Sequence, residues 1–454
     1  MNMDMETQLG DVIAVPYPFQ GHLNPMLQFC SSLSARGVRV TLVLTHRVAK
    51  SMPQSQPVHA VELISDGTDV GDSPRNYEEI TRLPAAVSEG VAAIIEKQKK
   101  AAKVLVHDAM MPWLLEVGRA GGLRVAPLFT QPASLCAIYW HMLRGDVVEL
   151  QQPITAASDC RLRLPSLPEM ELRDVASIFQ FPDNAKQIAE LIFCQASNLP
   201  KADCFLINTF YSLEEQVVDW MAEKWAVKCV GPLVPIFHKT LHEKHDRIDL
   251  FELDSESYLK WLDIREPKSV VYVSFGSVVV MSEEQMEEIA WGLAQSNKYF
   301  IWVVRESELV KLPKDFKLKT SEKGIIVKWC PQVEVLSHEA VACFMTHCGW
   351  NSILEALCLG VPMVGMPQMS DQPTNAKLIE DVWKVGVRVK VNAEGITTRQ
   401  EIKGCIKQVT GVRAEEFRRN VIKWRELAKE ATSEGGSSYE NIKDFVAFAK
   451  SYSD

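Results

Sequence analysis

A short block in the last third of the chain concentrates side chains that could hold a phosphorylated ligand. It begins with the aromatic Trp329, continues through His347 and the turn 349–352, and ends with the carboxylate–amide pair Asp371-Gln372. An indole offers a flat stacking surface, a turn that opens a helix offers backbone N–H donors to phosphate, and a carboxylate beside an amide can bind hydroxyl groups. In this order the groups match the base, the diphosphate and the hexose of a nucleotide sugar.

The centre of the block has the pattern of a phosphate site. The run 341–346 predicts a strand and the run 352–359 predicts a helix, with Gly349 between them. A helix N-terminus presents unsatisfied N–H groups and a partial positive charge, and glycine lets the backbone approach a ligand closely. Asn351 and Ser352 could donate to phosphate or only cap the helix, and His347 could be structural.

Other members of the block also have ordinary explanations. Trp329 could be a core residue, and Glu355 in the first helical turn could serve only the helix dipole. Asp371, which stands two residues before Pro373, could be a plain N-cap. Only the ordered combination favours a ligand site.

A histidine and an aspartate in the first half could supply proton transfer. His22 follows the strand-like run 11–16, and Asp108 ends the strand-like run 103–107. The carboxyl ends of parallel strands meet at one rim of a sheet, so the two side chains could form a pair in which the carboxylate orients the imidazole and stabilises its protonated form. Imidazole titrates near ~6.5, which makes it the natural general base near neutrality. The alternatives are a surface histidine and a strand-end helix cap.

Two sets of alternating strands and helices are required to position these residues. The first set has strand-like runs at 11–16, 38–45, 103–107, 125–130, 204–208 and 228–230, with helix-like runs at 22–36, 111–120 and 132–143. The second has strand-like runs at 269–275, 299–304, 324–328, 341–346 and 362–366, with helices from 282 and over 372–383. Such alternation predicts an α/β protein with two doubly wound domains. We place the domains at 1–235 and 258–434, with a linker at 236–257 and a closing helix within 435–454.

Composition excludes several classes of function. The chain has 454 residues, 47% of them hydrophobic, and a net charge of −9, which disfavours nucleic acid or an anionic membrane as the main partner. No apolar run reaches the ~18–20 residues of a membrane span, and residues 1–10 lack the pattern of a signal peptide. The eleven cysteines form no Cys-x-x-Cys pair, which predicts free thiols in the cytoplasm. His238, His242 and His245 of the linker are predicted to be solvated rather than metal-binding.

The block from 329 to 372 resembles, over its full length, the signature box of plant family-one UDP-glycosyltransferases. The runs 19–22 and 107–113 are similar to the N-terminal motifs of that family. The chain looks closest to the branch that glucosylates terpenoids, steroids and small aromatic acids or phenols. The resemblance implies two facing Rossmann-like domains (GT-B architecture), an N-terminal one for the acceptor and a C-terminal one for the UDP-sugar, with the last helix packed back on the first domain.

The resemblance also implies residue roles. His22 and Asp108 become the catalytic pair. Trp329 and the Cys330 backbone meet uracil, Gln332 and Glu355 the ribose, and Asp371 with Gln372 the hexose. The diphosphate meets His347, the Trp350 backbone, Asn351 and Ser352, with Ser277 nearby. The whole donor-binding set is Gly21, Thr130, Ser277, Trp329, Cys330, Gln332, His347, Trp350, Asn351, Ser352, Glu355, Asp371 and Gln372. The acceptor-binding candidates are Gln20, Met111, Trp113, Trp140, Ile192, Phe193 and Ser370, most of which would serve equally well as core.

The implied reaction is an inverting transfer of glucose from UDP-glucose to a hydroxyl or carboxyl of a small hydrophobic acceptor. No Asp-x-Asp motif is evident, so we expect no metal and no cofactor; we also expect a cytoplasmic monomer. Met369 stands where the family commonly has Trp, which leaves the strictness for glucose open, and His107 replaces a more usual Tyr. A dinucleotide-dependent oxidoreductase is disfavoured because Gly-x-Gly-x-x-Gly is absent after Pro16, and a non-catalytic UDP-sugar-binding protein would lack His22 or Asp108.

Overall fold

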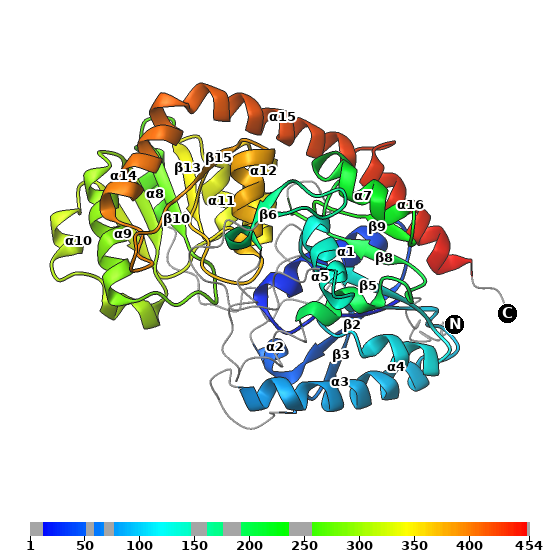
Figure 1. Ribbon diagram of the computed structural model, residues 1–454. Coiled ribbons are helices and arrows are strands. Elements are labelled where there is room, and N and C mark those ends of the chain that lie inside the picture. Colours follow the sequence, from blue (N-terminus) through cyan, green and yellow to red (C-terminus); the bar gives the residue numbers. More distant parts are fainter. Residues whose placement is uncertain are drawn as a thin grey trace.

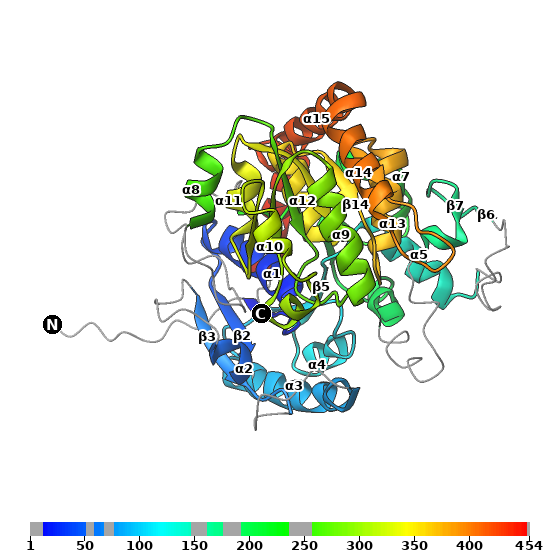
Figure 2. The ribbon, with the colours of Figure 1, turned by 90° about the vertical axis from the view of Figure 1, so that its left-hand side faces the viewer.

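The chain forms two α/β domains (Figures 1 and 2). A cavity lies between them. The computed structural model describes residues 12–50, 59–67, 77–146, 161–175, 192–235 and 257–451. The first ten residues and the three linker histidines lie outside these ranges. The domain boundaries at 235 and 257 stay a prediction, because residues 236–256 also lie outside them.

The N-terminal domain is built on a seven-stranded parallel sheet with the order β3-β2-β1-β4-β5-β8-β9. Its strands are β1 (Val12–Val15), β2 (Val40–Thr45), β3 (Ala60–Ile64), β4 (Val104–Asp108), β5 (Arg124–Phe129), β8 (Phe205–Ile207) and β9 (Val227–Cys229). Its helices include α1 (Gln20–Ser34), α2 (His46–Lys50), α3 (Tyr77–Lys97), α4 (Leu114–Ala120), α5 (Ala133–Leu143) and α7 (Glu215–Ala222). The strand order reverses between β1 and β4, and ligands of such sheets bind at that switch point.

The C-terminal domain repeats this plan with a six-stranded parallel sheet ordered β12-β11-β10-β13-β14-β15. Its strands are β10 (Val270–Ser274), β11 (Tyr299–Val303), β12 (Gly324–Val327), β13 (Val341–Thr346), β14 (Met363–Gly365) and β15 (Gly386–Arg388). Its helices are α8 (Ser257–Asp263), α9 (Glu283–Gln295), α10 (Phe316–Lys319), α11 (Gln332–Ser337), α12 (Trp350–Leu359), α13 (Gln372–Lys377), α14 (Arg399–Lys407) and α15 (Ala414–Thr432). Here the order reverses between β10 and β13. β10 leads to Ser277, and β13 leads to the turn 347–349 that precedes α12.

The last helix returns to the first domain. α15 runs along the C-terminal domain, and α16 (Ser437–Lys450) continues onto the N-terminal one (Figure 1). Ile442, Phe445 and Ala449 are buried in the core that contains α1, where the Phe445 ring lies 5.4 Å from the Phe29 ring. The predicted packing of the last helix is therefore confirmed.

Most predicted elements are present, with shifted ends. The strand-like run 341–346 is β13 itself. α4 begins at Leu114 rather than at 111, because Met111 lies in a turn in which the Leu114 N–H donates to its carbonyl. The predicted helix 372–383 is α13 followed by a π-helical turn over Leu378–Val382. No helix in the described part of the chain is long and apolar enough to cross a membrane.

Candidate active site

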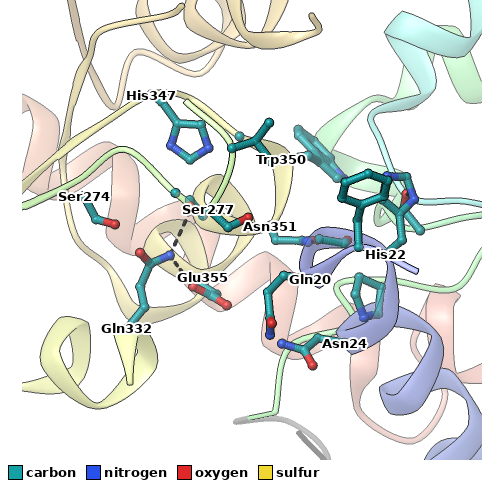
Figure 3. Close-up of a pocket in the computed structure, with 18 of the residues that line it drawn as sticks. Gln20, His22, Asn24, Ser274, Ser277, Gln332, His347, Trp350, Asn351 and Glu355 are labelled. Atoms are coloured by element: carbon teal, nitrogen blue, oxygen red, sulfur yellow. Dashed lines mark hydrogen bonds between the residues drawn. The ribbon is translucent and has the colours of Figure 1, made fainter. Parts of the chain in front are cut away.

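One cavity of about 300 Å³ lies between the two switch points. Figure 3 shows side chains of α1 on one side of it and Gln332, His347 and Glu355 on the other. The lining includes His22 and all thirteen predicted donor residues: Gly21, Thr130, Ser277, Trp329, Cys330, Gln332, His347, Trp350, Asn351, Ser352, Glu355, Asp371 and Gln372. The structure thus brings together residues from both halves of the chain.

His22 and Asp108 form a hydrogen-bonded pair at the N-terminal switch point. His22 lies in the first turn of α1 and Asp108 ends β4, so both stand at carboxyl ends of neighbouring strands. His22 Nδ1 is 2.8 Å from Asp108 Oδ2, and the other carboxylate oxygen accepts from the Met110 N–H at 2.9 Å. The carboxylate is buried, while the imidazole keeps about a fifth of its surface exposed.

The surroundings of His22 favour a stronger base. Burial lowers the pKa of His22, but the charge and hydrogen bond of Asp108, together with the charge of Asp371, outweigh it, so the pKa is raised. Thr130 Oγ1 lies 3.0 Å from the same Nδ1 atom. Because Nδ1 faces a carboxylate, it carries the proton, and Nε2 is left with the lone pair that a general base needs.

The N-terminus of α12 forms the side of the cavity that is predicted to bind phosphate. Its N-cap is Gly349, which has no side chain to satisfy the first N–H groups. Asn351 donates instead to the Gly21 carbonyl of the other domain at 2.7 Å, and Ser352 Oγ accepts from Gln332 Nε2 at 2.8 Å. The alternative that these two residues cap their own helix is therefore not what the structure shows. The unused N–H donors make this end suitable for an anion.

His347 is a different kind of histidine from His22. Burial lowers the pKa of His347 to about 4, and a hydrogen bond with the Ser274 backbone opposes this only in part. The ring is held between two glycines: a Cβ at Gly349 would lie 2.4 Å from its Nε2 atom, and one at Gly276, where φ is +73°, would lie 2.8 Å away. His347 is therefore neutral near pH 7 and can offer a hydrogen bond rather than a charge.

Gln332, Ser352 and Glu355 form a polar network at the far end of the cavity. Gln332 Nε2 donates to Ser352 Oγ and, at 2.6 Å, to Glu355 Oε2 (Figure 3). Trp329 also lines the cavity and is nearly buried, at 9% exposed. Trp350 contributes more than its backbone, because its indole N–H donates to the Asn208 carbonyl of the other domain at 2.7 Å.

Asp371 and Gln372 stand where α13 begins. Neither caps that helix through its side chain. Asp371 Oδ2 accepts from Asn375 Nδ2 at 2.7 Å, and burial raises the pKa of Asp371 to about 6, against the opposing hydrogen bond of Asn375. Gln372 Oε1 accepts from the backbone N–H groups of Gln368 and Met369 at 2.9 and 3.0 Å. These bonds orient the amide so that its nitrogen is the group available as a donor.

The predicted acceptor residues lie in several different places, and their role stays a prediction. Of the seven, only Gln20 lines the cavity. Met111 is 1% exposed in the core that also contains Leu114 and Leu115 of α4. Trp140 packs edge-on against Trp225, with 4.7 Å between ring centroids, and lines a separate hollow.

The remaining acceptor candidates also lie outside the cavity lining. Trp113 packs against the same core as Met111, and Ile192 and Phe193 pack against the core around Tyr139. Ser370 adopts a left-handed conformation with φ of +58° next to Asp371. Whether any of these residues contacts an acceptor stays a prediction.

Sequence reasoning missed several lining residues. Asn24 and Gln28 follow Gln20 at intervals of four on α1, and all three line the cavity; this helical spacing was a usable signal. Leu233 to Pro235, after β9, also line it, but nothing local in the sequence indicated them. Arg305 was missed as well: it donates to the Ser277 carbonyl at 2.6 Å and so fixes the loop after β10.

Both halves of the chain are similar to known proteins. Residues 255–434 match the family described as UDP-glucoronosyl and UDP-glucosyl transferase, and residues 11–64 match the glycosyltransferase N-terminal domain. UDP glycosyltransferase 9 of Catharanthus roseus is 46% identical over 96% of this chain and 96% of its own length. Mogroside I-E synthase of Siraitia grosvenorii is 41% identical over 98% of this chain and 100% of its own.

A solved structure shares the fold over nearly the whole chain. Os79 from O. sativa, crystallised with UDP and also with U2F and trichothecene, superposes with a TM-score of 0.87 for the UDP complex, at 35% identity over 97% of this chain and 100% of its own. The chain is thus an enzyme of the GT-B class. It belongs to the plant family-one UDP-glycosyltransferases, which act in secondary metabolism.

Proposed function

We propose that this enzyme transfers glucose from UDP-glucose to a hydroxyl or carboxyl of a small hydrophobic acceptor, such as a steroid, triterpenoid, flavonoid or phenolic. The observation that carries this proposal is that His22, which is paired with Asp108 in one domain, lines the same cavity as Asp371 and Gln372 of the other. The base and the sugar-binding pair then meet at the anomeric carbon.

The UDP-sugar would lie along the side of the cavity that is formed by the C-terminal domain. Uracil stacks on Trp329 and meets the Cys330 backbone, and the ribose hydroxyls bind Gln332 and Glu355, which already share a hydrogen bond. The diphosphate meets the α12 N-terminus, with Ser277 and neutral His347 nearby, and the hexose hydroxyls meet Asp371 and the Gln372 amide. Thr130 and Gly21 complete this site from the N-terminal domain.

The reaction would proceed by one displacement. His22 Nε2 takes the proton of the acceptor O–H while that oxygen forms a bond to the anomeric carbon. The bond from this carbon to the diphosphate oxygen breaks on the opposite face, so an α-linked donor gives a β-linked product. Asp108 stabilises the imidazolium, and the α12 N–H groups stabilise the charge that develops on leaving UDP.

The proposal is tested by incubating the enzyme with UDP-glucose and a panel of steroids, triterpenoids, flavonoids and benzoic acids, with mass spectrometry of the products. We expect a mass increase of one hexose on at least one acceptor, a β linkage by NMR, and full turnover in the presence of EDTA. UDP-galactose is the matched donor control, since it differs at one hydroxyl. Exclusive use of that donor, or retention of the α configuration, would overturn the proposal.

A further inference from the structure

A buried carboxylate outside the cavity joins the two domains. Asp174 ends the short 3-10 helix Leu172–Asp174, which follows the hairpin of β6 (Arg161–Leu162) and β7 (Met170–Glu171). This segment packs on the N-terminal domain: Leu162 and Met170 are buried in the same core as Phe129 and Tyr139. The Asp174 side chain is only 3% exposed.

Among the described residues, the three distant partners of Asp174 belong to the C-terminal domain. Arg388 Nη1, at the end of β15, is 2.5 Å from its Oδ1 atom, and Lys377 Nζ, at the end of α13, is 3.6 Å from Oδ2. The Asp174 carbonyl accepts from Thr374 Oγ1 at 2.8 Å, and Thr374 is completely buried. Asp174 is itself fixed, because its Oδ2 accepts from the Glu171 N–H at 2.9 Å.

Two of these partners sit on the helix that presents the sugar-binding pair. Thr374 and Lys377 lie on α13, which begins at Gln372 and has Asp371 as its N-cap. The C-terminal domain holds the same helix from its other side, where Asn375 Nδ2 donates to the Cys348 carbonyl at 2.9 Å. Asp174, which follows the β6–β7 hairpin of the N-terminal domain, therefore binds α13, the helix at whose start Asp371 and Gln372 lie.

We propose that Asp174 is a positioning residue for glucosyl transfer, which fixes α13 and so sets Asp371 and Gln372 relative to His22. The inference rests on the proposed binding of the hexose by that pair. Removing one member of a buried ion cluster leaves the charges of its partners uncompensated. Arg388 and Lys377 would then lose the carboxylate that both of them face. A shift of about 1 Å at a reacting centre can reduce the rate by ~10²-fold.

This role predicts an effect that depends on the hexose. UDP lacks the sugar, so the proposed site holds it only through Trp329 and the N-terminus of α12. UDP-glucose would also contact Asp371 and Gln372 at the start of α13. A purely structural role for Asp174 would weaken both ligands equally or would only lower the melting temperature.

The experiment compares D174N with T374V, which keeps the ion cluster and loses one hydrogen bond. The matched control is R399M, which removes an ion pair within the C-terminal domain, Arg399 Nε to Glu288 Oε1 at 2.8 Å, between α14 and α9. Calorimetry gives the Kd of UDP and of UDP-glucose, and kinetics give kcat/KM. For D174N we expect an unchanged UDP Kd and a kcat/KM for UDP-glucose reduced ~10–100-fold, with a smaller loss for T374V and none for R399M.

Three results would overturn the proposal: wild-type kcat/KM in D174N and T374V, equal weakening of UDP and UDP-glucose, or the same loss in R399M. Turnover of UDP-glucose by the wild type tests the proposed function separately, because only differences between variants report on Asp174. If D174N does not fold, the comparison of T374V with R399M decides the question by the same readouts.

Discussion

The two domains share a topology but use opposite chemistry at their switch points. The N-terminal switch point presents His22, whose pKa is raised by Asp108, and the C-terminal one presents His347, whose pKa burial lowers to about 4. The first histidine has a carboxylate at 2.8 Å, while the second is packed between the backbones of two glycines. The doubly wound fold thus places each histidine in the cleft, and the immediate neighbours raise the pKa of one and lower the pKa of the other.

The largest expected effect is at His22. H22A should reduce kcat by ~10²–10⁴-fold, the usual contribution of a positioned base, and leave the Kd of UDP unchanged because the C-terminal wall is intact. Steady-state kinetics and calorimetry measure the two quantities, with the melting temperature as the control for folding. Turnover close to that of the wild type would show that another group is the base.

Asp108 tests the origin of the difference between the two histidines. The carboxylate raises the pKa of His22, so without it burial dominates and the imidazole loses its proton at lower pH. D108N should therefore move the acidic limb of the kcat/KM profile to lower pH and reduce the plateau by ~10²-fold. An unmoved limb would contradict the assignment of that limb to His22.

A substitution at Gly349 tests whether the close packing around His347 matters for binding UDP. In G349A the new Cβ would meet His347 Nε2 at 2.4 Å, and such overpacking costs about 1–3 kcal/mol. If that cost falls on the bound state, the Kd of UDP rises about 5–150-fold, with little change in the pH profile. G404A is the matched control, because a Cβ at Gly404 of α14 would meet no atom within 4 Å.

The smallest effect concerns Asp371, which we propose contacts the sugar. Its pKa of about 6 lies above the ordinary value, so the carboxylate is ionised above about pH 6 and protonated below it. If the ionised form binds the hexose hydroxyls, the affinity for UDP-glucose should fall by up to about tenfold per pH unit below pH 6. Calorimetry from pH 5 to pH 8 should show this slope in the wild type and a flat profile in D371N.

The elements that could be predicted are those with a strong local signal. β13 was predicted to the residue because it is an apolar run buried along its whole length. β15 has three residues, and α3 contains an internal Pro84, so neither had a clear pattern. The residues of the site could be named from the signature box, but Asn351 bonding to Gly21 and Asp174 bonding to Arg388 join positions 330 and 214 residues apart. No local pattern reports such pairs.

The return of the chain through α16 limits how the molecule can be divided. Residues near the C-terminus complete the core of the first domain, where Phe445 packs on Phe29 and Ser438 Oγ donates to the Gly231 carbonyl at 2.5 Å. A fragment that stops after β9 would expose that apolar surface to water. Chimaeras that exchange acceptor halves between relatives should therefore carry both ends of the parent sequence together, with only the middle replaced.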